Sequence, residues 1–321
     1  MKSSNLLKSV LYVACLLALF TSCKKESQKP QTTITQQVPD DPALSYTIED
    51  YKILFKKNTN GQMPEGKSFS FSLEQLATLS ENINQYIPDW ENISEEELQK
   101  IEKENRISRD KLIEKADEIR TRYIARKRFK LYEAISKYVQ EDHTSTNARV
   151  DYYYGLNEEE FWVLFWNPSC IDGTKKATDR AFAYELALFK NNSWLTKGDA
   201  FRHSIWNVLI ANYNKHEFNY KSEAAAFAKK FTDAHESGGE TPTNVLDNPM
   251  DYHNNAQGRN YFLSVAVNRG KLSWWGYDSR WIETPSDDVL KDAIYVKASN
   301  ATKITSTQQL PSLSSVHVYV N

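Results

Sequence analysis

Residues 198–210 read GDAFRHSIWNVLI, a run in which apolar residues surround a few charged ones. On a helix, Asp199 and His203 lie one turn apart on the same face. Phe201 and Ile205 lie on the opposite face, so the helix is apolar on two sides. A helix of this kind is buried in a protein core. The stretch therefore predicts a mainly α-helical domain with a buried Asp/His pair.

A second predicted helix carries polar residues in its last turn. It runs from about Ser222 to Glu236 and is ended by Gly238-Gly239, because glycine is favoured just beyond the last residues of a helix. His235 falls on the same side as Phe231 and is expected to point into the core. Glu236 lies about 100° further round the helix and is expected at the rim of the same pocket.

A third predicted helix begins near Pro249, since proline is favoured in a first helical turn. Asp251 and Asn255 share one face of this helix, whereas His253 points elsewhere. Gly258 lets another element approach the helix closely. The three helices are expected to converge on one polar pocket.

The residue types in this pocket fit three kinds of site. Two histidines with one or two carboxylates form the ligand set of a catalytic zinc or similar ion. Alternatively, His203 and His235 act as general acid and base, oriented by Asp199 and Glu236. In the third interpretation, the polar groups form a buried hydrogen-bond network that fixes helix packing. The chain has no HExxH or CxxC motif that would select among them.

The same residues resemble a bacterial and phage family, domain of unknown function 6973. Its signature is DAFRHxxW, then AHE, then MDxxNNxxGR, and the similarity covers roughly residues 155–270. The family has no established activity, so the resemblance implies only which residues belong to a shared site. These residues are Asp199, Arg202, His203, His235, Glu236, Asp251, Asn254, Asn255 and Arg259.

The first functional hypothesis is a metal-dependent hydrolase that acts on an anionic phosphoester or lipid-like substrate. Its divalent metal, zinc in the first instance, would be held by His203, His235 and Asp251. Asp199 would orient a ligand and Glu236 would act as the general base. The substrate would be bound by Arg202, Asn254, Asn255 and Arg259. The alternative is a non-catalytic structural or interaction protein whose helical region 71–147 binds another protein.

The N-terminus predicts a lipid-anchored protein of the bacterial cell envelope. Residues 10–20 (VLYVACLLALF) are apolar and follow two lysines, the pattern of a secretory signal. Eleven residues are too few for a transmembrane helix, which needs about 20. The following Thr21-Ser22-Cys23 resembles a lipoprotein box, in which the cysteine is acylated and becomes the first mature residue. We expect Cys23 to anchor the protein, with the outer membrane as its location.

Composition restricts the remaining classes. The 321 residues include 40 basic and 42 acidic side chains, so the net charge of −2 argues against a nucleic-acid-binding protein. Hydrophobic residues make up 40% of the chain, enough for a substantial core. Of the three cysteines, Cys15 leaves with the signal and Cys23 is acylated. Cys170 therefore has no disulfide partner and is expected to be buried.

The chain divides into a signal peptide (1–22), a tether with a docked arm (23–70), a helical hairpin region (71–147), a helical domain with the polar site (148–290) and a β-rich tail (291–321). The absence of Gly and Pro between Trp90 and Asn147 predicts two long helices.

Three short segments carry weaker signals. Ser94 and Glu97 form a capping box that would start one of the long helices. Residues 46–55 alternate in part, as an edge strand or a docked arm would. Residues 293–296 and 315–320 alternate as strands do and predict a small terminal β element.

Overall fold

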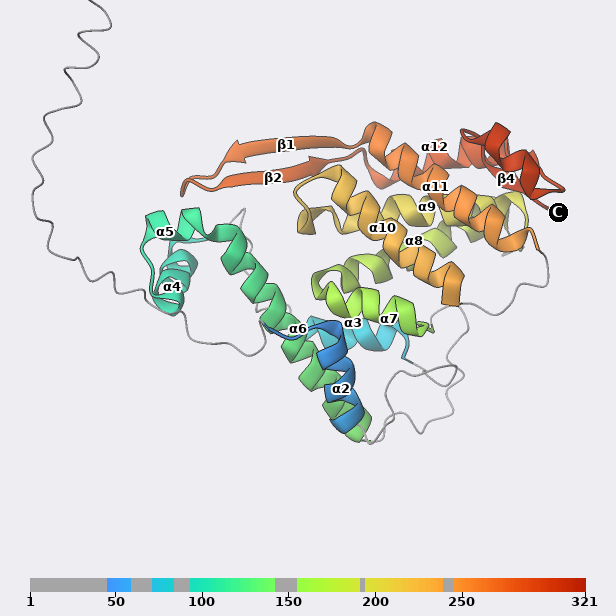
Figure 1. The fold of residues 1–321 in the computed structure, drawn as a ribbon. Coiled ribbons are helices and arrows are strands. Elements are labelled where there is room, and N and C mark those ends of the chain that lie inside the picture. Colours follow the sequence, from blue (N-terminus) through green and yellow to red (C-terminus); the bar gives the residue numbers. More distant parts are fainter. Residues whose placement is uncertain (1–44, 59–70, 84–92, 142–154, 191–193, 239–244) are drawn as a thin grey trace, which may run out of the picture. The chain divides into compact units, whose positions relative to one another are not determined.

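The computed structural model describes residues 45–58, 71–83, 93–141, 155–190, 194–238 and 245–321. These residues belong to one compact unit, which spans Asp40–Asn321. They form a mainly α-helical fold with two small two-stranded sheets near the C-terminus (Figure 1). The predicted fold class is thereby confirmed. The predicted signal peptide, the predicted tether up to residue 44 and Cys23 lie outside the described residues. No described helix has the length and apolar character needed to cross a membrane.

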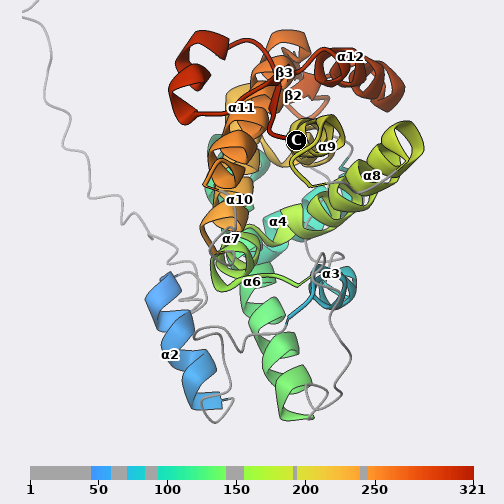
Figure 2. The same cartoon turned by 90° about the vertical axis from the view of Figure 1, so that its right-hand side faces the viewer.

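Helix α9 (Lys197–Tyr213) is the central element of the fold. It packs against α8 (Ile171–Phe189), α10 (Lys221–Gly238), α11 (Asp247–Val265) and α12 (Asp287–Ser299) (Figures 1 and 2). Nearly every α9 side chain is buried, as the two apolar faces predict. Polar groups on α9 are therefore removed from water and must find partners inside the protein.

Helix α7 (Glu158–Trp166) packs against α10 and continues into a 3-10 turn, η3 (Pro168–Cys170). A capping box between Asn157 and Glu160 starts α7. The apolar run that follows is buried, and so is Cys170, as predicted.

The N-terminal arm is helical. Helix α2 (Ile48–Asn58) buries Tyr51 and Phe55, which are one helical turn apart and contact Phe165. The docked-arm interpretation is confirmed and the edge strand is wrong, because the buried residues follow a helical rather than a two-residue period. Helix α3 (Leu73–Glu81) follows and packs against α8.

Two long helices were expected after residue 90, but only one forms. The region contains α4 (Glu95–Asn105), α5 (Arg109–Glu114) and α6 (Ala116–Gln140). The capping box of Ser94 starts α4 as predicted. The helix then stops because Arg106 adopts a left-handed conformation with φ of 53°. Nothing in the sequence predicts this helix end, because Arg rarely adopts the left-handed conformation.

The sheets differ from the expected ones. Strands β1 (Val267–Leu272) and β2 (Asp278–Glu283) form an antiparallel hairpin that was not predicted. Residues 293–296 lie in α12 and are not a strand, because Leu290, Ile294 and Ala298 recur every fourth residue and are buried. The segment 315–320 does contain a strand, β4 (Val318–Tyr319), which pairs in parallel with β3 (Thr302–Lys303).

Candidate functional site

The imidazole of His203 lies at the centre of a buried polar cluster. Helix α9 contributes Asp199 and His203, α10 contributes Glu236, and α11 contributes Asp251. His203 is only 4% exposed, and the three carboxylates are also buried. Gly258 allows the close crossing of α9 and α11, since a Cβ atom there would lie 2.1 Å from the Ser204 carbonyl oxygen. The predicted role of this glycine is confirmed.

The two nitrogens of His203 face different carboxylates. The Nε2 atom lies 3.4 Å from Asp199 Oδ1 and 3.2 Å from Asp251 Oδ1. The Nδ1 atom lies 3.4 Å from Glu236 Oε1. Ligand atoms of Asp199, His203 and Asp251 all lie within 4.8 Å of one another, so this group could hold a metal ion. Imidazole and carboxylate are suitable donors for zinc and for other divalent transition metals.

Arg202 closes the cluster on the side of α8. Its guanidinium group forms an ion pair with Asp199, and its Nη2 atom lies 3.2 Å from His203 Nε2. Its Nη1 atom donates to Glu185 Oε2 on α8 at 3.2 Å. Glu185 is fully buried. Four buried carboxyl groups thus share Arg202 and the imidazole, which leaves an excess of negative charge when all four are ionised.

Several buried atoms of the cluster lack hydrogen-bond partners. Among the described residues they are His203 Nδ1, Asp251 Oδ1 and Glu185 Oε1. An unpaired buried polar atom costs about 1–3 kcal/mol, so native proteins rarely keep one without a reason. A cation at Asp251 Oδ1 would remove one of these costs.

The pKa values reflect this crowding. Burial raises the pKa of Asp199, but Arg202 and His203 more than compensate and bring it to about 2. Burial and the neighbouring carboxylates hold the pKa of Asp251 well above its usual range. Burial lowers the pKa of His203, yet Asp251, Asp199 and Glu236 together raise it well above its ordinary value.

A chain of amides connects the cluster to Arg259. Asn255 donates from Nδ2 to Glu236 Oε1 at 2.9 Å and accepts from Asn207 Nδ2 at 2.6 Å. Asn207 Oδ1 accepts from Thr232 Oγ1 and from Arg259 Nη1, at 3.1 and 2.8 Å. Asn255 thus orients a carboxylate of the cluster, and Arg259 lies at the other end of the network.

The neighbouring Asn254 has a different environment. Its side-chain amide donates to the carbonyl oxygen of Val318 and accepts from the Val318 N–H, at 2.9 and 3.1 Å. His253 contacts the Val316 carbonyl oxygen at 2.7 Å. Both side chains therefore hold the C-terminal strand β4 against α11, and His253 does point away from Asp251 as expected.

His235 is not part of the cluster, and its predicted burial is wrong. It lies in the last turn of α10, where its side chain is 43% exposed and packs edge-on against Trp206. Its Nδ1 atom lies 2.8 Å from Glu160 Oε1 on α7. Burial lowers the pKa of His235, but Glu160 outweighs this effect and raises it. The metal-capable group contains Asp199 in the place expected for His235.

Three buried participants were not predicted from sequence: Glu160, Glu185 and Asn207. The sequence pattern does indicate burial for two of them, Glu185 and Asn207. Glu185 continues the buried stripe of Thr174, Thr178 and Ala181 on α8, and Asn207 lies one turn beyond His203.

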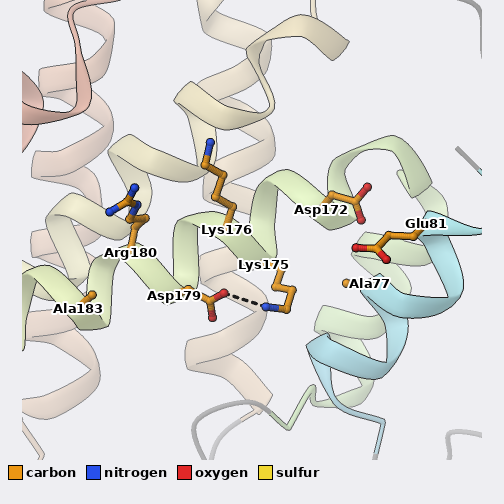
Figure 3. A pocket seen from close by; sticks show the side chains of 8 residues that line it. All are labelled: Ala77, Glu81, Asp172, Lys175, Lys176, Asp179, Arg180 and Ala183. Carbon is orange, nitrogen blue, oxygen red and sulfur yellow. Dashed lines mark hydrogen bonds and ion pairs between the residues drawn. The ribbon is translucent and has the colours of Figure 1, made fainter.

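Two surface depressions lie away from the cluster. One, of about 370 Å³, is lined by charged residues of α8, including Lys175 and Asp179, which form an ion pair (Figure 3). The other, of about 900 Å³, lies among α2, α7, α10 and Tyr252 of α11. Neither depression is lined by His203 or its carboxylates.

Comparison with known proteins identifies the central part of the chain. No curated protein matches it. Residues 161–273 match a family described as "Domain of unknown function (DUF6973)". The matched segment runs from α7 to the β1–β2 hairpin and includes His203 with its three carboxylate neighbours. Residues 161–273 are therefore similar to the DUF6973 family, and the buried Asp/His/Asp group lies inside the matched segment.

Proposed function

We propose that the His203 cluster is a divalent-metal centre and that the protein is a metal-dependent hydrolase of the cell envelope. The observation that carries this proposal is the buried group of Asp199, His203 and Asp251, whose ligand atoms lie within 4.8 Å of one another. Asp251 Oδ1 accepts no hydrogen bond and has only the 3.2 Å contact with His203 Nε2, and the cluster has an excess of carboxylates. Both observations support the proposal, because a cation would satisfy both.

Each side chain has a defined task in this proposal. Asp199, His203 Nε2 and Asp251 hold the ion, while Glu236 orients the imidazole through Nδ1. A bound divalent ion lowers the pKa of a coordinated water and polarises the bond to be cleaved. We propose zinc, since one imidazole and two carboxylates suit it.

The proposed substrate carries an anionic group, as in a phosphoester. Arg259 supports this class, because it is only partly buried and its hydrogen bonds to Asn207 and Thr232 are to neutral groups. Arg202, in contrast, is already paired with two carboxylates.

Acylation at Cys23 would place the domain at a membrane surface. Cys23→Ser is therefore expected to move the protein from the membrane to the soluble fraction.

Metal content and affinity test the centre directly. Purified protein is expected to contain about one divalent ion per chain, and apo protein should bind zinc in titration calorimetry. Asp251→Asn should abolish binding, while the control Asp292→Asn, which removes an exposed carboxylate from α12, should not. Absence of metal from wild-type protein, together with no binding in the titration, would refute the proposal.

A second function is favoured by one observation. Arg202 already contacts both Asp199 and His203, so the cluster has an internal cation. In this alternative the cluster is a structural hydrogen-bond network in a non-catalytic envelope protein. It requires that His203→Gln lowers the free energy of unfolding while wild-type protein binds no metal.

A further inference from the structure

Arg202 contacts two of the three side chains that would hold the ion, His203 and Asp199. Its Nη2 atom lies 3.2 Å from His203 Nε2, and its guanidinium group pairs with Asp199. An imidazole nitrogen has a single lone pair, so His203 cannot serve Arg202 and a metal at once. A guanidinium group next to a divalent cation would also be repelled strongly in this buried environment.

Helix α8 provides a second position for the same guanidinium group. Glu185 Oε2 already accepts from Arg202 Nη1, whereas Glu185 Oε1 is buried and has no hydrogen-bond partner. One turn earlier on α8, the ring of Phe182 lies 5.3 Å from the Arg202 guanidinium carbon. A small rotation of Arg202 toward α8 would convert its single bond with Glu185 into a two-bond fork.

We propose that Arg202 is an internal cation that exchanges with the metal, and that Glu185 receives it. Without metal, Arg202 neutralises Asp199 and contacts His203. On metal binding it moves onto Glu185, which frees Asp199 for the ion, and the proton on Nε2 leaves to solvent so that the Nε2 lone pair can bind the ion. The inference rests on the proposed metal centre and assigns a positioning role to Glu185, a residue that touches none of the ligands in the contacts described above.

Zinc titration of the full chain by calorimetry tests this exchange. Arg202→Gln removes the competing cation and is expected to raise zinc affinity about tenfold, a change of about 1.4 kcal/mol. Glu185→Gln removes the charged acceptor and is expected to lower the affinity about tenfold. The matched control Asp179→Asn, on the exposed side of the same helix, should leave it unchanged. Circular dichroism establishes that each variant is folded.

The outcomes separate the two proposals. If wild-type protein binds zinc and Arg202→Gln leaves the affinity unchanged or lowers it, the exchange is wrong and the metal centre stands. If neither wild type nor Arg202→Gln binds zinc, the metal centre itself is wrong. Should Glu185→Gln not fold, Arg202→Lys provides the test: it keeps the charge but cannot form the fork, so it should bind zinc more weakly than wild type.

Discussion

The environment of His203 assigns a role to each neighbouring carboxylate. A metal-binding histidine coordinates through one nitrogen and donates its other N–H to an orienting group. Asp199 and Asp251 share the Nε2 side, whereas Glu236 faces Nδ1. In the proposed centre, Asp199 would be a ligand and not the orienting residue expected from sequence, and Glu236 would orient His203 and not act as the general base.

This arrangement predicts a graded response to substitution. Glu236→Gln keeps the acceptor for Asn255 and His203 but removes the charge, so zinc affinity should fall about 10- to 100-fold without being lost. Titration calorimetry measures the change, with the exposed Glu159→Gln as control. Complete loss of binding would instead identify Glu236 as a ligand, and an unchanged affinity would contradict its orienting role.

The buried His317 is expected to make the free energy of unfolding depend on pH. Burial, with smaller contributions from Lys297 and His253, lowers the pKa of His317 to about 4 from 6.5. The unfolded chain therefore binds a proton that the folded chain excludes, and stability should fall as pH drops from about 6.5 to 4. The full effect is about 3 kcal/mol. Urea unfolding at pH 7 and pH 5 measures it.

The comparison requires two variants. His317→Gln should reduce the difference in unfolding free energy between pH 7 and pH 5, whereas the exposed His216→Gln should preserve it. Equal pH dependence in wild type and His317→Gln would show that another group is responsible.

The position of each residue around its predicted helix identified some members of the His203 cluster from sequence. Asp199, His203 and Asp251 lie on buried faces as predicted. The predicted burial of His235 is wrong because a helical wheel gives the direction of a side chain but not whether other elements cover it at the end of a helix. Glu185 was missed because burial of an acid depends on a partner, here Arg202, that sequence does not place beside it.

The crossing of α9 and α11 depends on a single glycine. A Cβ atom at residue 258 would lie 2.1 Å from the Ser204 carbonyl oxygen, and backbone cannot yield as a side chain can. Gly258→Ala is therefore expected to force the helices apart, lower the unfolding free energy by about 1–3 kcal/mol and weaken zinc binding. Urea unfolding and calorimetry measure both effects.

Gly270 in β1 is the matched control. A Cβ atom at residue 270 would meet its nearest neighbour at 3.7 Å, which is ordinary contact. Gly270→Ala should leave stability and zinc affinity near the wild-type values. If the two substitutions have equal effects, close packing at the crossing is not the cause.

Local signals located helix starts better than strands. The capping box of Ser94 was predicted correctly, and α10 ends at Gly238, two residues beyond the predicted Glu236, because caps satisfy backbone groups within a few residues. The β1–β2 hairpin was missed because every residue of β1 is exposed, so the strand lacks alternation. Four residues at 293–296 were too few to distinguish a strand from a buried helix.

The described residues form a large core, a smaller core at α4–α6 and a third cluster of four buried residues that includes Val318 of β4. The smaller core consists of apolar residues of α4, α5 and α6 together with Trp275, from the turn of the β1–β2 hairpin. Leu112, Ala116, Ile119 and Tyr123 recur at helical spacing in the sequence and form half of its buried residues. This spacing indicates an apolar helix face but not its partner, since the contact joins segments about 150 residues apart. The DUF6973 match ends at residue 273, so Trp275 lies just outside it.

Trp275 should therefore control the stability of α4–α6 separately from the His203 cluster. Its side chain is 4% exposed, so Trp275→Ala removes a large part of the smaller core and should cost about 3–5 kcal/mol there. Trp274→Ala is the control, because that side chain is 61% exposed. In hydrogen exchange, Trp275→Ala should abolish amide protection in α4–α6 and leave α9 protected, with zinc affinity unchanged. Equal loss of protection in α9 would show that the two cores unfold as one unit, in which case the hairpin would transmit changes in α4–α6 to the metal-capable group.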